Sequence, residues 1–94
     1  MATLIPPGRA PEFITPANGR TFSLPELQAL VGGYIEALRT EDGGWLFINE
    51  DGKRLRLVPN PVATEFMRNR LRPDDYIVGP AVVCSPQEAG DGEL

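Results

Sequence analysis

The amino-acid sequence predicts one small α+β domain, with a mainly antiparallel sheet of about four to five strands and two short helices in the rough order β-β-α-β-β-β-α-β. Three observations support this fold class. Short apolar runs alternate with turns rich in glycine and proline. Two segments begin with residues that cap helices. The length of 94 residues allows only one modest hydrophobic core.

The first twenty residues are predicted to form two short edge strands, or one strand and a loop. Residues 12–15 form the clearer strand segment, because turn sequences at residues 6–8 and 16–19 bracket them. Proline has no backbone N–H to donate to a sheet, so the prolines of this region favour positions at a sheet edge.

A first helix is predicted to begin at Ser23. Ser23 and Glu26 have the spacing of a capping box, in which each side chain accepts a hydrogen bond from the other residue's backbone N–H. Phe22 and Leu27 stand at the positions of a hydrophobic staple across this cap. The glycine pair at residues 32–33 then supplies the left-handed conformation at which helices end, so the helix should be short.

The middle of the chain is predicted to contain three strands. Residues 34–38 and 45–49 are expected to pair antiparallel around a glycine-containing loop at residues 41–44. A three-residue hairpin loop at residues 50–52 should lead into a strand at residues 54–58, where basic and apolar residues alternate. One face of that third strand is therefore expected to be buried and the other to be cationic.

A second helix is predicted from Asn60, as its cap, to Pro73, with Pro61 at the first helical position. Its expected buried stripe consists of Val62, Ala63, Phe66, Met67 and Leu71. Residues 76–78 and 81–83 should form a final apolar strand, with a bulge or an edge position at Gly79 and Pro80. The domain is expected to span residues 1–84, and the acidic segment 85–94 is expected to be a disordered tail.

The composition argues against several kinds of chemistry. The chain has no histidine and one cysteine, Cys84, so it lacks the usual zinc ligands and cannot form an internal disulfide. Cys84 is expected to be a buried small apolar residue, and Glu36 and Glu50 cannot be placed together as a catalytic pair from sequence. Signal-peptide and membrane-spanning patterns are absent. We therefore expect a cytoplasmic protein that is not an enzyme and has no metal, no cofactor and no membrane contact.

Charged residues are segregated along the chain. Residues 36–51 carry five acids and one base, whereas residues 53–72 carry six bases and one acid. If the basic residues are adjacent in the fold, they could bind phosphates or an acidic partner, and the alternative is a merely solvated cationic face. The candidate binding residues are Lys53, Arg54, Arg56, Arg68 and Arg70, together with Asn60, whose simpler role is a helix cap, and Tyr34.

Four segments resemble the DUF3846 family of small proteins of unknown function, which occur in phages, plasmids and bacterial genomes. These are Leu30–Glu36, Asn49–Lys53, Asn60 with Ala63, and Ile77–Val83, within a resemblance that spans residues 24–83. The resemblance implies a mobile-element setting. It carries no catalytic residue to this chain.

Three functional hypotheses follow. The first is a non-enzymatic binding protein of a phage or other mobile element that acts on another protein, for example a host defence component. The second is nucleic-acid or nucleotide binding through Lys53, Arg54, Arg56 and the arginines of the second helix, which predicts a steep salt dependence. The third and weakest is an enzyme with a carboxylate-based site. A homodimer is a further option if Tyr34 and Trp45 form a contact surface and not part of the core.

Overall fold

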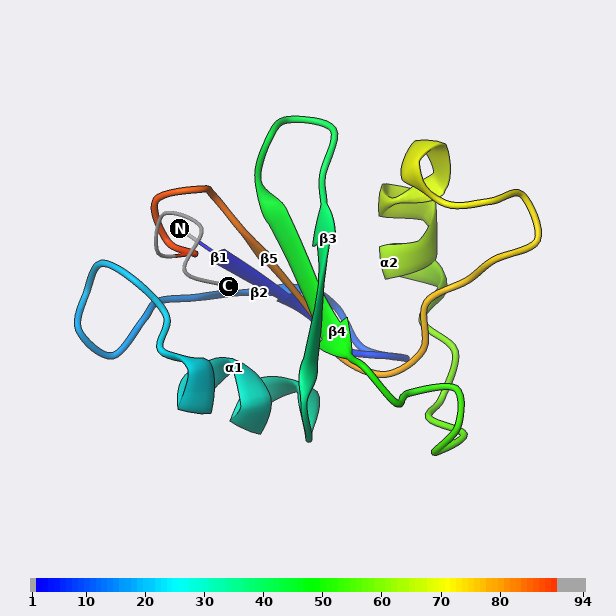
Figure 1. The fold of residues 1–94 in the computed structure, drawn as a ribbon, viewed down its shortest axis with the longest axis horizontal. Coiled ribbons are helices and arrows are strands. Elements are labelled where there is room, and N and C mark those ends of the chain that lie inside the picture. Colours follow the sequence, from blue (N-terminus) through cyan, green and yellow to red (C-terminus); the bar gives the residue numbers. More distant parts are fainter. Residues whose placement is uncertain (1, 90–94) are drawn as a thin grey trace.

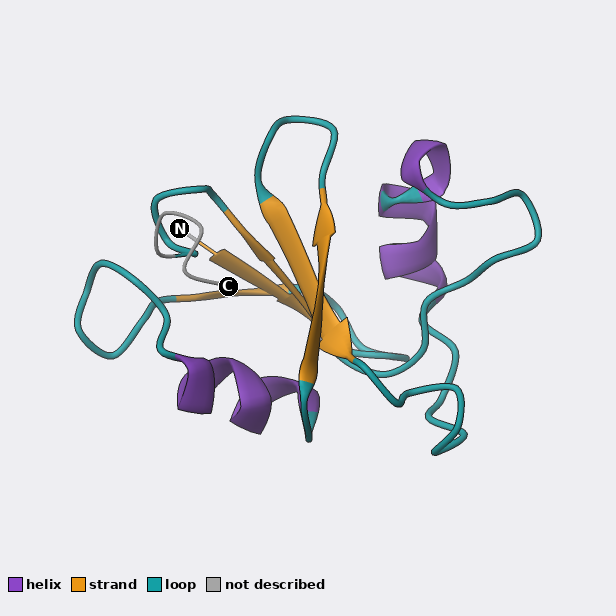
Figure 2. Ribbon diagram, viewed as in Figure 1, coloured by secondary structure: helices purple, strands orange, loops and turns teal. Residues whose placement is uncertain are grey.

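The computed structural model of the protein describes residues 2–89, which form a five-stranded antiparallel sheet with one helix packed on each face (Figures 1 and 2). The strand order is β2-β1-β5-β4-β3. The elements are β1 (Ala2–Ile5), β2 (Glu12–Ile14), α1 (Leu24–Val31), β3 (Ile35–Arg39), β4 (Trp45–Asn49), α2 (Pro61–Phe66), the 3₁₀ turn η1 (Arg68–Arg70) and β5 (Ala81–Cys84). The predicted fold class is confirmed. No helix within residues 2–89 has the length and apolar character needed to cross a membrane.

The two ends of the described chain meet in the middle of the sheet. β5 lies between β1 and β4, and its Val82 is opposite Leu4 on one side and Phe47 on the other. β1 is therefore an internal strand, and only β2 is an edge strand in the first twenty residues. The prediction of two edge strands was correct for β2 and wrong for β1, because β5 supplies β1 with a partner from the far end of the chain.

α1 has the cap that the sequence predicts. The Ser23 Oγ accepts a hydrogen bond from the Glu26 N–H at 3.2 Å, and the Glu26 Oε1 accepts one from the Ser23 N–H at 2.9 Å. Gly32 ends the helix with a φ of 82°. Leu27 and Phe22 are both buried in the apolar cluster under α1.

α2 begins as predicted and ends earlier. Asn60 caps it, but the helix stops at Phe66 and the 3₁₀ turn η1 follows. Ala63 and Met67 are buried against the sheet, whereas Val62 and Phe66 are exposed. Each exposed residue precedes a buried one by one position, which turns it about 100° around the helix axis and away from the sheet. The predicted buried stripe is therefore wrong for Val62 and Phe66.

The strand predicted at residues 54–58 does not form. Residues 50–56 make consecutive turns, Leu55 and Val58 are exposed, and Arg56 has a φ of 58°. Both sides of β4 are already occupied by β3 and β5, so the alternating segment cannot form the predicted hairpin with β4. The predicted hairpin loop at residues 50–52 is consequently wrong, and so is the strand at residues 76–78, where Val78 makes a single bridge to Pro59.

The C-terminal segment is part of the fold as far as it is described. The Glu88 carbonyl accepts a hydrogen bond from the Phe22 N–H at 2.8 Å, and Ala89 is buried in the cluster under α1. The predicted disordered tail is thus wrong for residues 85–89, and residues 90–94 lie outside the described part of the chain. Cys84 is buried in the same cluster.

Candidate functional site

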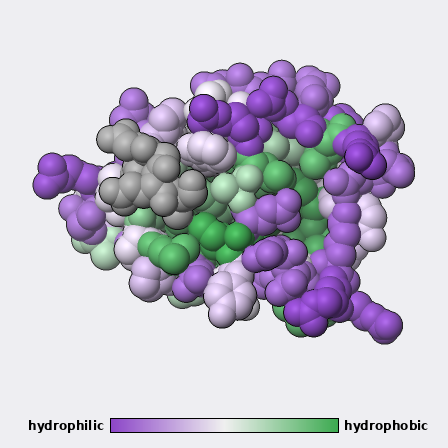
Figure 3. Space-filling model, in the orientation of Figure 1, coloured by the Kyte–Doolittle hydropathy of each residue, from purple (hydrophilic) through white to green (hydrophobic). Residues whose placement is uncertain are grey.

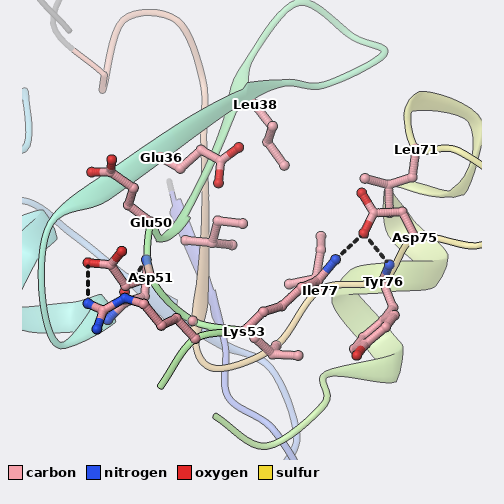
Figure 4. A pocket seen from close by; sticks show the side chains of 14 residues that line it. Glu36, Leu38, Glu50, Asp51, Lys53, Leu71, Asp75, Tyr76 and Ile77 are labelled. Atoms are coloured by element: carbon pink, nitrogen blue, oxygen red, sulfur yellow. Dashed lines mark hydrogen bonds and ion pairs between the residues drawn. The ribbon is translucent and has the colours of Figure 1, made fainter. Parts of the chain in front are cut away.

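A cleft of about 250 Å³ opens beside the β3–β4 hairpin, between its α2-side face and the segments 50–54 and 71–78 (Figure 4). Its apolar lining includes Val78 and four residues that belong to the cluster under α2, which are Leu38, Ile48, Leu71 and Ile77. Its charged lining consists of Glu36, Glu50, Asp51, Lys53, Arg54 and Asp75. The cleft therefore combines an apolar floor with a rim of mixed charge.

One ion pair joins two residues that line the cleft. Lys53 forms a hydrogen-bonded ion pair with Asp75 (Figure 4), and its ammonium group lies 4.6 Å from the centroid of the Tyr76 ring. The hydrogen bond from Lys53, followed by one from the Tyr76 N–H, lowers the pKa of the Asp75 carboxyl, and the same ion-pair hydrogen bond raises the pKa of Lys53. Both groups are thus charged at neutral pH.

A second ion pair lies on the turn after β4. The Arg54 guanidinium is 3.3 Å from the Asp51 carboxylate, and the Arg54 side chain remains largely exposed. Each of these two ion pairs therefore joins a basic residue of the segment 53–72 to a carboxylate of the same chain. The two ion pairs partly neutralise the charges of two rim carboxylates, Asp51 and Asp75.

The remaining rim acids have no such partner. Glu36 and Glu50 accept no side-chain hydrogen bond and form no ion pair with any residue in the range 2–89, although Glu36 is close enough to Lys53 to contribute to raising the pKa of Lys53. Glu36 is opposite Ile48 on β4, and the Glu50 N–H donates to the Tyr34 carbonyl, so the two glutamates are diagonal neighbours on one sheet face. Figure 4 shows both side chains at the same end of the cleft.

The structure does not gather the predicted basic residues into one patch. Lys53 and Arg54 line the cleft, and Arg68 reaches Asp75 by donating to its carbonyl at 3.4 Å. Arg70 lies at the other end of β3, where its Nε donates to the Arg39 carbonyl at 3.3 Å. Arg56 is exposed in the turn region and does not line the cleft.

Two other predicted binding residues lie elsewhere. Asn60 is only 1% exposed and its side chain is fully occupied by hydrogen bonds inside the fold, so it is a structural residue. Tyr34 is 70% exposed just before β3 and does not line the cleft. Trp45 is half-buried, and the Arg39 guanidinium lies 4.5 Å from the centroid of its ring.

Sequence reasoning missed the residues that make the cleft apolar. Leu38 and Ile48 each occupy an ordinary inward-facing position in a strand, and nothing in the sequence distinguishes them from fully covered core residues. Because α2 ends at Phe66, it leaves part of that sheet face open. No local signal in the sequence marks this end of the helix. On the face in Figure 3, apolar residues are visible near the middle of the surface and hydrophilic side chains surround them.

Comparisons with known proteins identify a family without an assigned activity. A family model described as a domain of unknown function, DUF3846, matches residues 1–94. This match is longer than the resemblance that the sequence motifs carry over residues 24–83. No curated protein and no solved structure matches the chain.

Proposed function

The chain belongs to the DUF3846 family, and we propose that this member is a non-enzymatic binding protein that holds a segment of another protein in the cleft beside β3. The observation that carries the proposal is the combination of an apolar floor, formed by Leu38, Ile48 and Leu71, with a charged rim. Such a surface resembles the core and rim of protein–protein contacts, where apolar anchors give affinity and charges at the edge give specificity.

The exposure of the rim carboxylates favours binding over catalysis. A carboxyl group that acts as a general acid or base near neutral pH usually sits in a desolvated site. Glu36 and Glu50 are both solvent-exposed, and they are better suited to recognising a charged partner than to transferring protons. The setting in a phage or other mobile element, the cytoplasmic location and a target among host defence proteins remain predictions from the family resemblance and the sequence.

A capture experiment tests the proposed function. The tagged protein is incubated with nuclease-treated bacterial lysate, and bound proteins are quantified for the wild type and for Leu38→Gln. We expect Leu38→Gln to reduce recovery of a stoichiometric partner roughly tenfold, because it places a polar group in the centre of the apolar floor. Leu24→Gln is the matched control, since Leu24 is 46% exposed on α1, which packs on the opposite sheet face. Equal recovery by the wild type and Leu38→Gln would contradict binding through the cleft.

Nucleic-acid binding has weaker support. Lys53 and Arg54 are engaged with carboxylates, and Arg70 lies at the other end of β3. The hypothesis stays a prediction, and it can be tested with the same tagged protein. A steep fall in nucleic-acid affinity with salt, lost on the double substitution Arg54→Glu with Arg56→Glu, would favour it over protein binding.

A further inference from the structure

β3 is an open sheet edge next to the cleft. In the antiparallel ladder with β4, the Tyr34 carbonyl accepts a hydrogen bond from the Glu50 N–H and the Thr40 N–H donates to the Gly44 carbonyl, so the intervening Ile35 and Ala37 direct their N–H and C=O groups outward. Within residues 2–89 these outward groups have no hydrogen-bond partner. The next outward carbonyl, that of Arg39, accepts a hydrogen bond from Arg70. The open edge is therefore short and ends at η1.

The side chains of β3 connect this edge to the cleft. Glu36 and Leu38 line the cleft, whereas Ile35 and Ala37 pack against the cluster under α1 on the other face. A strand added to β3 would place alternate side chains beside Glu36 and Leu38, at the closely spaced positions of the antiparallel ladder. Figure 4 shows Glu36 and Leu38 projecting from β3 into the cleft.

The charge around Glu36 determines which kind of partner segment is complementary to this edge. Asp51 and Asp75 already have basic partners, so the surplus charge at the end of the cleft near Glu36 is negative and comes from Glu36 and Glu50. At the position of Leu38 the surface is apolar, because Ile48 and Leu71 also contribute to it. A complementary segment therefore needs an apolar side chain at one position and a basic side chain two residues away.

From this juxtaposition we propose that β3 accepts an extended segment of a partner protein as an added antiparallel strand. In the partner, an apolar residue lies beside Leu38, and a lysine or arginine two residues later lies beside Glu36 and within reach of Glu50. The outward backbone groups of Ile35 and Ala37 hold the segment, as in other cases of strand addition. The inference rests on the proposed function, and it adds the binding mode and the chemistry of the partner.

A second copy of the chain is a poorer occupant. Antiparallel pairing of two β3 strands about Ala37 would set Glu36 of one copy beside Leu38 of the other. No basic residue would then face Glu36, and the apolar position would receive a carboxylate. Homodimerisation through β3 is accordingly an outcome of the test and not the proposal.

The test uses a short synthetic peptide and the whole protein. The peptide has blocked ends, threonine at most positions and a leucine followed two residues later by a lysine. Its binding is measured by isothermal titration calorimetry and by shifts of backbone amide NMR signals. We expect saturable binding with the largest shifts at residues 35–38. A peptide of the same composition with the lysine two residues before the leucine should bind more weakly.

Two variants separate edge binding from other contacts. Glu36→Arg should weaken peptide binding roughly tenfold, because an attractive cross-strand pair becomes a repulsive one. Glu12→Arg makes the same charge change on the exposed edge strand β2 and should leave affinity unchanged. Ala37→Pro removes one outward N–H from an edge where proline is tolerated, and should abolish binding while circular dichroism confirms the fold. Equal affinity in Glu36→Arg and Glu12→Arg, or no saturable binding of the peptide, would overturn the inference.

The outcomes also separate this inference from the proposed function. If partner capture depends on Leu38 but survives Glu36→Arg and Ala37→Pro, the added strand is wrong and binding through the cleft stands. If neither a partner nor the peptide binds, both proposals fail. If sedimentation shows a dimer that Ala37→Pro dissociates, β3 pairs with itself and the proposed partner is wrong.

Discussion

At the scale of single residues, Asn60 joins three parts of the fold. Its Oδ1 accepts a hydrogen bond from the Ala63 N–H at 3.1 Å, and its Nδ2 donates to the carbonyls of Ile5 and Gly79 at 2.8 Å each. The cap on α2 was predictable, because it depends on neighbours in sequence. The two bonds to the end of β1 and the turn before β5 were not, because they depend on the complete fold.

We expect Asn60→Ala to lower the free energy of unfolding by about 3 kcal/mol, since it removes a helix cap and leaves two buried carbonyls without this donor. Urea unfolding followed by circular dichroism measures the change. Asn69→Ala removes an exposed asparagine and should cost less than about 0.5 kcal/mol. Similar costs for the two variants would show that the buried hydrogen bonds of Asn60 contribute little.

Cys84 makes the fold less stable as the pH rises into the alkaline range. Burial, with a smaller contribution from the charge of Glu88, raises the pKa of the Cys84 thiol from 9.0 to about 12. Between these two values the unfolded chain loses the thiol proton and the folded chain keeps it. The contribution of Cys84 to stability is therefore complete below pH 9 and is lost as the pH rises toward 12.

We expect the free energy of unfolding to fall less steeply above pH 9 in Cys84→Ala than in the wild type. Urea unfolding at several pH values measures both slopes, and the comparison removes the contribution of every other group that both proteins share. In the native wild type, a thiol reagent at pH 8 should label Cys84 only as fast as the protein opens. Parallel pH slopes would contradict the assignment to Cys84.

At the scale of elements, local signals predicted what is locally determined. The cap at Ser23 and the end at Gly32 follow from interactions within a few residues, and both are present. The segment 54–58 has the alternation of a strand, but it cannot pair with β4, because β3 and β5 flank β4. A strand is a property of a pair, so its sequence pattern alone could not decide the outcome.

A second capping box lies in the C-terminal segment that the composition predicted to be disordered. Ser85 and Glu88 have the same spacing as Ser23 and Glu26, and they make the same reciprocal bonds: the Glu88 Oε1 accepts from the Ser85 N–H at 3.1 Å and the Ser85 Oγ accepts from the Glu88 N–H at 3.3 Å. The signal was present in the sequence. It was outweighed by the acidic and glycine-rich composition of the segment as a whole.

We expect Ala89→Asp to lower the free energy of unfolding by at least about 3 kcal/mol, because Ala89 is 2% exposed in the cluster with Phe22 and Leu27 and a carboxylate there would be desolvated. Gln87→Asp introduces the same residue at an exposed position and should be nearly neutral. Thermal unfolding of both variants provides the comparison. A small effect at both positions would mean that the segment 85–89 adds little to the domain.

At the scale of the whole molecule, the fold class was predictable and the site was not. Hydrophobic alternation and turn residues suffice to indicate a small antiparallel sheet with two helices. The cleft, in contrast, draws its lining from β3, from the turn after β4 and from the segment before β5. The sequence also suggested a cationic surface at residues 53–72, whereas folding brings Lys53 and Arg54 to carboxylates and leaves Glu36 and Glu50 without an ion pair within residues 2–89.

The central pairing of β1 with β5 affects how the protein is made. Translation proceeds from the N-terminus, so the β1–β2 hairpin leaves the ribosome while the strand that will lie beside it, β5, has not yet been synthesised. During that interval the β1–β2 hairpin lacks the strand that joins it to β4, so the apolar side chains that β5 will cover remain exposed. Contacts between such distant segments also slow folding once synthesis is complete. The nascent chain is accordingly most vulnerable to proteolysis and aggregation until residues 81–84 have emerged.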